Sequence, residues 1–258
     1  MIVYKYVPFD SAEKIISQSS IGFSGLRFLN DPFEGGYINA DERLRSRLHS
    51  KYAVLSFTRQ PLNSLMWAHY GDSHQGVVLE IDAEKAGLCN TDTCLIPAQY
   101  GDVIYTSNKP IEEISLSYSN DLRNYLTAIK FSHDCYEFYK LAFLHKSLDW
   151  AYEEEVRVVK SICGYPDGDH VFGEYNVGSD VFNRTNIGSK DQERPLDCLN
   201  IRPESIVSAY LGLRVNQENK MKAVQWATDL KIKLYKCGLD SKSWNLKAEP
   251  YIFKNEGS

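Results

Sequence analysis

The chain has 258 residues and a mass of 29.5 kDa, enough to bury a substantial core in one large domain. A formal net charge of -5 and a pI near 5.7 argue against nucleic-acid binding by bulk phosphate neutralisation, and leave room only for a local basic groove. A hydrophobic fraction of 43% and a charged fraction of 24% are ordinary for a globular protein and argue against disorder.

The cysteines and the apolar runs indicate the cellular compartment. Six cysteines are scattered along the chain without CxxC spacing, so we expect free thiols in a reducing cytoplasm. No signal-like apolar segment precedes the first strand, and no uncharged apolar run approaches the roughly 18 residues of a membrane span. We therefore expect a cytoplasmic protein with no membrane partner.

Apolar periodicity and turn residues predict the elements of the first half of the chain. Strands are expected at residues 2–7, 21–24, 52–58 and 75–81, and helices at residues 10–18 and 41–50. A capping box formed by Asp10 and Glu13 marks the start of the first helix. The last two strands are long apolar runs, joined by a polar and aromatic turn.

The second half alternates between strands and helices. Strands are expected at residues 100–105, 156–162, 198–201, 206–211 and 231–235, helices at 111–129, 135–146 and 216–230, and an irregular excursion at 164–193. Because strands occur both in pairs and after helices, we predict an α+β fold with residues 1–258 in a single domain. Neither a GxGxxG nor a GxxxxGK[ST] motif is present, so Rossmann and P-loop nucleotide binding are not supported.

The segment NDPFEGG is predicted to be a loop that holds polar side chains rigidly. Pro32 restricts the backbone, and Gly35 and Gly36 permit another backbone or a ligand to approach closely. Asn30, Asp31 and Glu34 would then project from a fixed frame. Taken alone, the segment is equally typical of an ordinary Asx-Pro turn.

The segment MWAHYGDSHQG gathers Trp67, His69, Tyr70, Asp72 and His74 between two core strands. Such a turn can provide aromatic walls for a flat ligand. A metal site formed by the two histidines and the aspartate is the alternative interpretation. No recurring ligand spacing such as HExxH is present, so we rank structural or ligand-contacting histidines above metal ligands.

The segment WAYEEEVRVV places three acids before a β-branched strand. Strand alternation predicts that Glu153, Glu155 and Arg157 share one face. One carboxylate would form an ion pair with Arg157 while the other serves chemistry, and the sequence does not divide these roles. The less specific alternative is a solvated, charged turn.

Taken together, YKY, FLNDPFEGG, LSF, LMWAHYGDSHQG and KSLDWAYEEEVR resemble an uncharacterised bacterial family across most of the chain. The order of elements also resembles the ADP-ribosyltransferase fold, in which a late strand follows an ExE acid pair. That resemblance implies two small, mostly antiparallel sheets that form a cleft with flanking helices. It also implies that NAD is a substrate in this cleft and that no metal is required.

The second resemblance implies roles for particular residues. Glu155, the second acid of the pair, would stabilise the oxocarbenium-like ribose, with Glu153 beside it. The residues implied in NAD binding are Lys5, Tyr6, Asn30, Asp31, Phe33, Ser56, Trp67, His69, Tyr70 and His74. The first strand departs from the transferase pattern, because it offers Lys5 and Tyr6 where Arg or His is expected.

The function expected from the resemblance is NAD-dependent ADP-ribosylation of a macromolecule, a protein or a nucleic acid, by a toxin or phage-defence effector. An antitoxin or chaperone would be a natural partner. Three alternatives stay open: an NAD glycohydrolase with water as the acceptor, a metal-dependent hydrolase or nuclease, and a non-enzymatic nucleotide-binding module.

Overall fold

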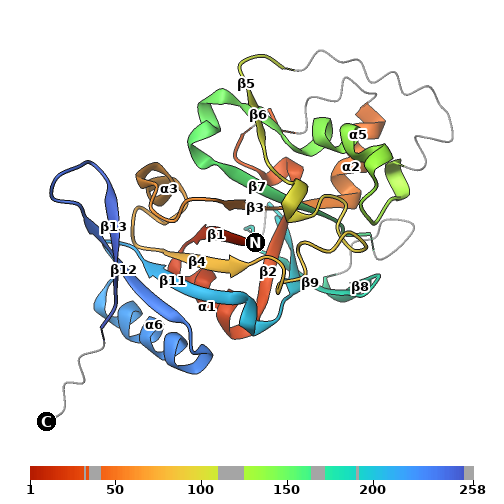
Figure 1. The fold of residues 1–258 in the computed structure, drawn as a ribbon. Helices are drawn as coiled ribbons and strands as arrows, with labels where there is room; N and C mark the ends of the chain where they lie inside the picture. The colour runs from red at the N-terminus through yellow and green to blue at the C-terminus, as the bar shows by residue number, and fades with distance from the viewer. Residues whose placement is uncertain (32, 35–41, 110–124, 164–171, 190–191, 253–258) are drawn as a thin grey trace, which may run out of the picture.

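The structure is a computed structural model that describes residues 1–31, 33–34, 42–109, 125–163, 172–189 and 192–252. It has an α+β fold with one large mixed sheet of 11 strands and a small parallel sheet of two strands (Figure 1). No described helix has both the length and the apolar character that membrane crossing requires. All six cysteines are free thiols.

The elements follow one another along the chain with short connections. The strands are β1 (Ile2–Val7), β2 (Ser20–Gly25), β3 (Tyr52–Thr58), β4 (Val77–Asp82), β5 (Ile104–Thr106), β6 (His145–Ser147), β7 (Glu155–Ser161), β8 (Gly173–Val177), β9 (Asp180–Asn186), β10 (Pro195–Asn200), β11 (Ile206–Leu211), β12 (Lys233–Leu239) and β13 (Leu246–Pro250). The α-helices are α1 (Phe9–Gln18), α2 (Glu42–Lys51), α3 (Ser64–His69), α5 (His133–Phe143) and α6 (Gln217–Leu230). Short 3-10 turns are η1 (Leu26–Phe28), η2 (Ala98–Tyr100), η3 (Leu148–Glu153) and η4 (Pro203–Ser205).

The large sheet branches at β3. Its main path runs β13-β12-β11-β4-β1-β3-β2-β10-β9-β8, so β13 and β8 lie at its opposite ends, and β7 pairs with β3 off this path (Figure 1). Strand β7 pairs with β3 over its whole length, from Tyr52↔Ser161 to Thr58↔Glu155. On its other edge, β3 meets β1 only at Tyr4↔Thr58 and meets β2 only at its first residues, Ser24↔Val54 and Gly25↔Ala53. Strands β1 and β2 therefore separate along the middle of β3.

Helices cover both faces of this branched sheet. Helix α1 places Phe9, Ala12 and Ile16, at helical spacing, against one face, where they pack in one core cluster with Trp226 of α6. A second cluster joins α5 to the other face of β3 and β7, and a third packs α3 against β1, β4 and β12. Strand β3 is almost wholly buried because it lies between these layers, as its continuous apolar run predicts.

Several predicted elements differ from the structure. The two small sheets expected from the transferase resemblance are one continuous sheet, because Tyr4↔Thr58 pairs β1 with the end of β3. Residues 164–193 were expected to be irregular, yet β8 and β9 add a hairpin to the sheet. The turn between β3 and β4 contains α3, which begins at Asn63, whose side chain accepts bonds from two backbone amides. Most of the helix predicted at 111–129 lies outside the described residues.

One close backbone approach fixes β7 against the preceding connection. The Arg157 amide donates to the Gly101 carbonyl at 2.8 Å, and a Cβ on Gly101 would lie 1.9 Å from the Arg157 carbonyl oxygen. We expect Gly101→Ala to lower the unfolding free energy by at least about 1–3 kcal/mol in urea titrations, because β7 must move to admit the methyl group. Gly238→Ala is the matched control, since its nearest contact would be an ordinary 3.5 Å. Equal effects of the two variants would contradict this account.

Candidate functional site

A cavity of about 330 Å³ lies where β1 and β2 separate along β3. It is lined by strand residues, by the η1 turn and the loop after it, by α3, and by the acidic segment before β7. Its lining includes Tyr4, Lys5, Tyr6, Gly22, Ser24, Phe28, Asn30, Glu34, Ser56, Met66, His69, Tyr70, Lys146, Glu153, Glu155 and Arg194. The branch of the sheet therefore brings together segments from residue 4 to residue 194.

Lys5 occupies the gap between the two diverging strands. Its ammonium donates to the backbone carbonyl of Ser56 at 2.8 Å, a group that lies between the two short pairings of β3. Burial lowers the pKa of Lys5 to about 8, although the nearby Glu155 carboxylate acts in the opposite direction. The ammonium satisfies a buried carbonyl and also lines the cavity.

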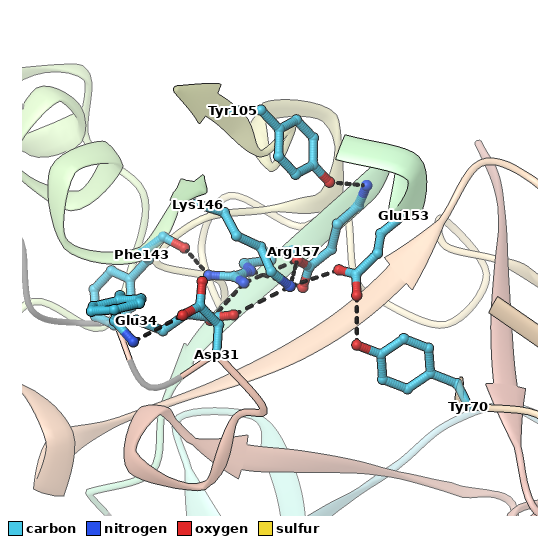
Figure 2. Close-up of polar contacts among 10 residues, drawn as sticks. Asp31, Glu34, Tyr70, Tyr105, Phe143, Lys146, Glu153 and Arg157 are labelled. Carbon is cyan, nitrogen blue, oxygen red and sulfur yellow. Dashed lines mark hydrogen bonds and ion pairs between the residues drawn. The ribbon is translucent and has the colours of Figure 1, made fainter. Parts of the chain in front are cut away.

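A buried ionic cluster forms one wall of the cavity (Figure 2). Lys146 from β6 lies 2.6 Å from Glu153, 3.1 Å from Glu155 and 3.2 Å from Glu34. Arg157 binds Glu155 through Nε at 2.8 Å and Nη2 at 2.9 Å, and its Nη2 lies 2.6 Å from Glu34. All five side chains are at most 5% exposed. Three carboxylates thus surround two cations, which leaves one net negative charge if all five are ionised.

The two acids of the ExE pair converge by a bend and not by strand alternation. Glu153 is the last residue of η3, Glu154 has a left-handed backbone with φ 43°, and β7 begins only at Glu155. This turn, and not a continuous strand, directs both carboxylates to Lys146. The expected pairing of Glu155 with Arg157, two residues further along β7, is present in the structure.

Hydrogen bonds and charges give the carboxylates different environments. Burial opposes ionisation of Glu155, but the charges of Arg157 and Lys146 outweigh it and lower the pKa of Glu155 to about 2. Burial also acts on Glu34, and there it prevails over Arg157, so the pKa of Glu34 is raised. Glu155 is therefore a fixed negative charge whose two oxygens are both bound by Arg157.

Glu153 has a different set of partners. One of its oxygens accepts a hydrogen bond from the Tyr70 hydroxyl at 2.5 Å, and the other binds Lys146. Burial raises the pKa of Tyr70, and the Glu153 carboxylate reinforces this shift. The tyrosine therefore keeps its proton and acts as a donor to Glu153.

The NDPFEGG loop contributes to the site through Asn30 and Glu34. Asn30 lines the cavity, and Glu34 enters the ionic cluster. Asp31 is buried instead beneath the loop, where its carboxylate accepts from the Phe33 amide at 2.9 Å. Phe33 is 55% exposed and does not line the cavity, and Lys109 lies over its ring. The two glycines of the motif lie outside the described residues.

The α3 segment divides its predicted site residues into two groups. His69 and Tyr70 line the cavity, whereas Trp67 is 0% exposed and donates its indole N–H to the Pro61 carbonyl. His74 stacks on Trp67 with ring centroids 6.2 Å apart. Three consecutive left-handed residues, Asp72 to His74, turn the chain away from the cavity. Trp67 and His74 therefore pack α3 onto the sheet.

The metal-binding alternative does not find its residues together. His69 faces the cavity, while Asp72 lines a separate small pocket at the start of α6 and His74 stacks on Trp67. Within the described ranges, no group of three or more His, Cys, Asp or Glu residues is arranged to hold a metal ion.

Eight of the predicted site residues line the cavity: Lys5, Tyr6, Asn30, Ser56, His69, Tyr70, Glu153 and Glu155. The sequence analysis did not assign Glu34, Lys146 or Arg194 to the site. Lys146 begins the KSLDWAYEEEVR motif and Glu34 belongs to NDPFEGG, so a search for cations to compensate the acid pair would have found the first. Arg194 follows the segment expected to be irregular, and no sequence pattern marks it.

Removing the guanidinium should destabilise the fold, because Glu34 and Glu155 would remain buried with Lys146 as their only cation in the described cluster. We expect Arg157→Met to lower the unfolding free energy by about 3–5 kcal/mol at neutral pH. Lys247→Met is the control, because the Lys247–Glu249 pair is solvent-exposed and should contribute at most about 1 kcal/mol. Comparable losses for both variants in denaturant titrations would contradict a structural role for the cluster.

Comparison with known proteins gives one match, which covers part of the chain. No curated protein and no solved structure matches the chain, so the resemblance to the ADP-ribosyltransferase fold stays a prediction. Residues 66–158 match a protein family described as a protein of unknown function (DUF2971). The matched segment begins in α3 and ends in β7, and it includes His69, Tyr70, Lys146 and the Glu153-to-Arg157 segment. The similarity to an uncharacterised family therefore covers most of the cavity's acidic wall.

Proposed function

We propose that the protein is an NAD-dependent ADP-ribosyltransferase and that the cavity at the branch of the sheet binds the nicotinamide end of NAD. The observation that carries the proposal is the buried carboxylate of Glu153, fixed by two donors in the wall of this cavity. The volume of about 330 Å³ lies in the lower part of the range for small-molecule sites. The remainder of the dinucleotide would extend toward the opening.

The other walls offer groups that suit the rest of the ligand. Tyr6, Tyr70 and His69 provide flat surfaces against which a pyridine ring can pack. Lys5 and Arg194 supply positive charge for a diphosphate. Asn30 and Ser24 add polar groups that can bind ribose hydroxyls.

The chemistry requires a negative charge that is already in place. As the bond between ribose C1′ and nicotinamide breaks, nicotinamide leaves with the electron pair and positive charge develops on the ribose. A carboxylate held beside C1′ stabilises this charge without reorganising. The acceptor then bonds to C1′ and loses a proton. Glu153 is assigned the direct contact, and Glu155 positions Lys146 and Arg157, because both of its oxygens are already bound.

Replacing Glu153 should affect catalysis more than binding. We expect Glu153→Gln to reduce nicotinamide release by about 100- to 1,000-fold with little change in KM, because the lost interaction forms in the transition state. Glu154→Gln is the matched control: it makes the same change one residue away, at an exposed side chain bound to Gln60. Retained release in Glu153→Gln, with both variants folded, would exclude this role.

The dependence on an acceptor identifies the reaction within this proposal. Release that requires a cell lysate and vanishes in Glu153→Gln is expected of a transferase. Release without lysate would instead identify an NAD glycohydrolase that uses the same residues. No release and no NAD binding under any condition would overturn the proposal.

Lys5 should make NAD binding depend on pH. Its pKa of about 8 means that the ammonium is charged below this pH and neutral above it. We therefore expect the Kd for NAD, measured by calorimetry, to rise as pH increases through about 8. Lys5→Arg should flatten this dependence because arginine stays charged. An unchanged dependence in the variant would show that another group controls binding.

A further inference from the structure

A second cavity of about 440 Å³ lies on the other side of the η1 turn. Phe28 lines both cavities, and adjacent residues divide between them, with Ser24 and Arg194 in the first and Gly25 and Pro195 in the second. The Arg194 guanidinium donates to the Phe28 carbonyl at 2.9 Å. One aromatic residue and its backbone therefore separate the two spaces.

The second cavity has basic walls. Arg27, His49 and Arg184 line it, together with Asp197 as its single described carboxylate. Asp197 is already satisfied by the protein, because it accepts from Arg184 Nε at 2.7 Å and from the Tyr175 hydroxyl at 2.6 Å. Arg184 is 4% exposed and is held in place by this pair and by the Tyr175 ring beneath it. The site is thus built around a fixed guanidinium.

Helix α2 adds to this basic character. It supplies Ser46, His49 and Ser50 to the cavity, and its sequence, ERLRSRLHSK, contains four Lys or Arg residues and one acidic residue. This concentration of positive charge stands out in a chain whose net charge is -5. A local basic groove on an acidic protein is the form in which phosphate binding is compatible with this composition.

We propose that the second cavity binds the phosphodiester backbone of a single-stranded nucleic acid, which serves as the ADP-ribose acceptor. The acceptor role rests on the proposed function, whereas the binding itself does not. Fixed guanidinium groups and serine hydroxyls bind phosphate oxygens. Phe28, half-buried with Arg27 4.7 Å over its ring, provides a surface on which a base can stack. A strand with its phosphate in this cavity would present its neighbouring nucleotide across Phe28 to the first cavity.

The test is the binding of a short, fluorescein-labelled oligothymidylate, followed by fluorescence anisotropy without NAD. We expect binding at about 50 mM salt that weakens steeply as salt is raised, because counterions are released from the phosphates. Arg27→Glu should weaken binding by about tenfold and lower the salt dependence. Ser46→Glu, a second exposed position in the cavity, should act in the same direction.

Arg202→Glu is the matched control. It makes the same change in charge at an exposed residue beyond the Ser20 end of β2, whereas the cavity lies at the Gly25 end. Equal weakening by Arg202→Glu, or no binding at low salt, would overturn the proposal. Displacement of the oligonucleotide by ADP at matched ionic strength would also overturn it, by assigning the cavity to the dinucleotide. Because NAD turnover is absent from the assay, its failure is distinguishable from failure of the proposed transferase activity.

Discussion

Two buried cations, Lys146 and Arg157, hold three carboxylates that come from separate segments of the chain. Any one of these charges alone in the interior would cost several kcal/mol, so each segment can be buried only when the others are in place. The loop after η1, strand β6, the bend at Glu154 and strand β7 are therefore coupled through one electrostatic constraint. The position of the acidic wall follows from this compensation of charge.

The branch of the sheet gives that wall a cavity to face. If β1 and β2 both paired with β3 along its length, Ser56 would be an ordinary ladder residue and the space would be closed. Because the two strands diverge, the Ser56 carbonyl takes the Lys5 ammonium as its donor in place of a strand amide. The hydroxyl of the same serine bonds to Glu155. A gap in backbone pairing and a cluster of buried charge thus meet at one residue of β3.

The two cavities share a wall and differ in charge. On one side of Phe28, carboxylates held by Tyr70 and Lys146 suit a developing cation. On the other side, Arg27 and Arg184 suit an anion. This opposition across a single aromatic residue connects the proposed cleavage of NAD to the proposed binding of the acceptor, and it separates the two by about the size of one side chain.

The sequence by itself determined the α+β class, most strands, the α1 and α6 helices, and the segments that supply the site, because apolar periodicity and turn chemistry are local properties. It also gave the Glu155–Arg157 pair, since residues two apart on a strand share a face. Tertiary structure alone decided that Trp67 and His74 pack into the core while Tyr70 faces the cavity, because that division depends on which surface α3 covers. It also decided the branch at β3, the bend at Glu154 and the compensation of Glu34 and Glu153 by Lys146. These features join residues more than one hundred positions apart, and buried charge is compensated by position in space and not by neighbours in sequence.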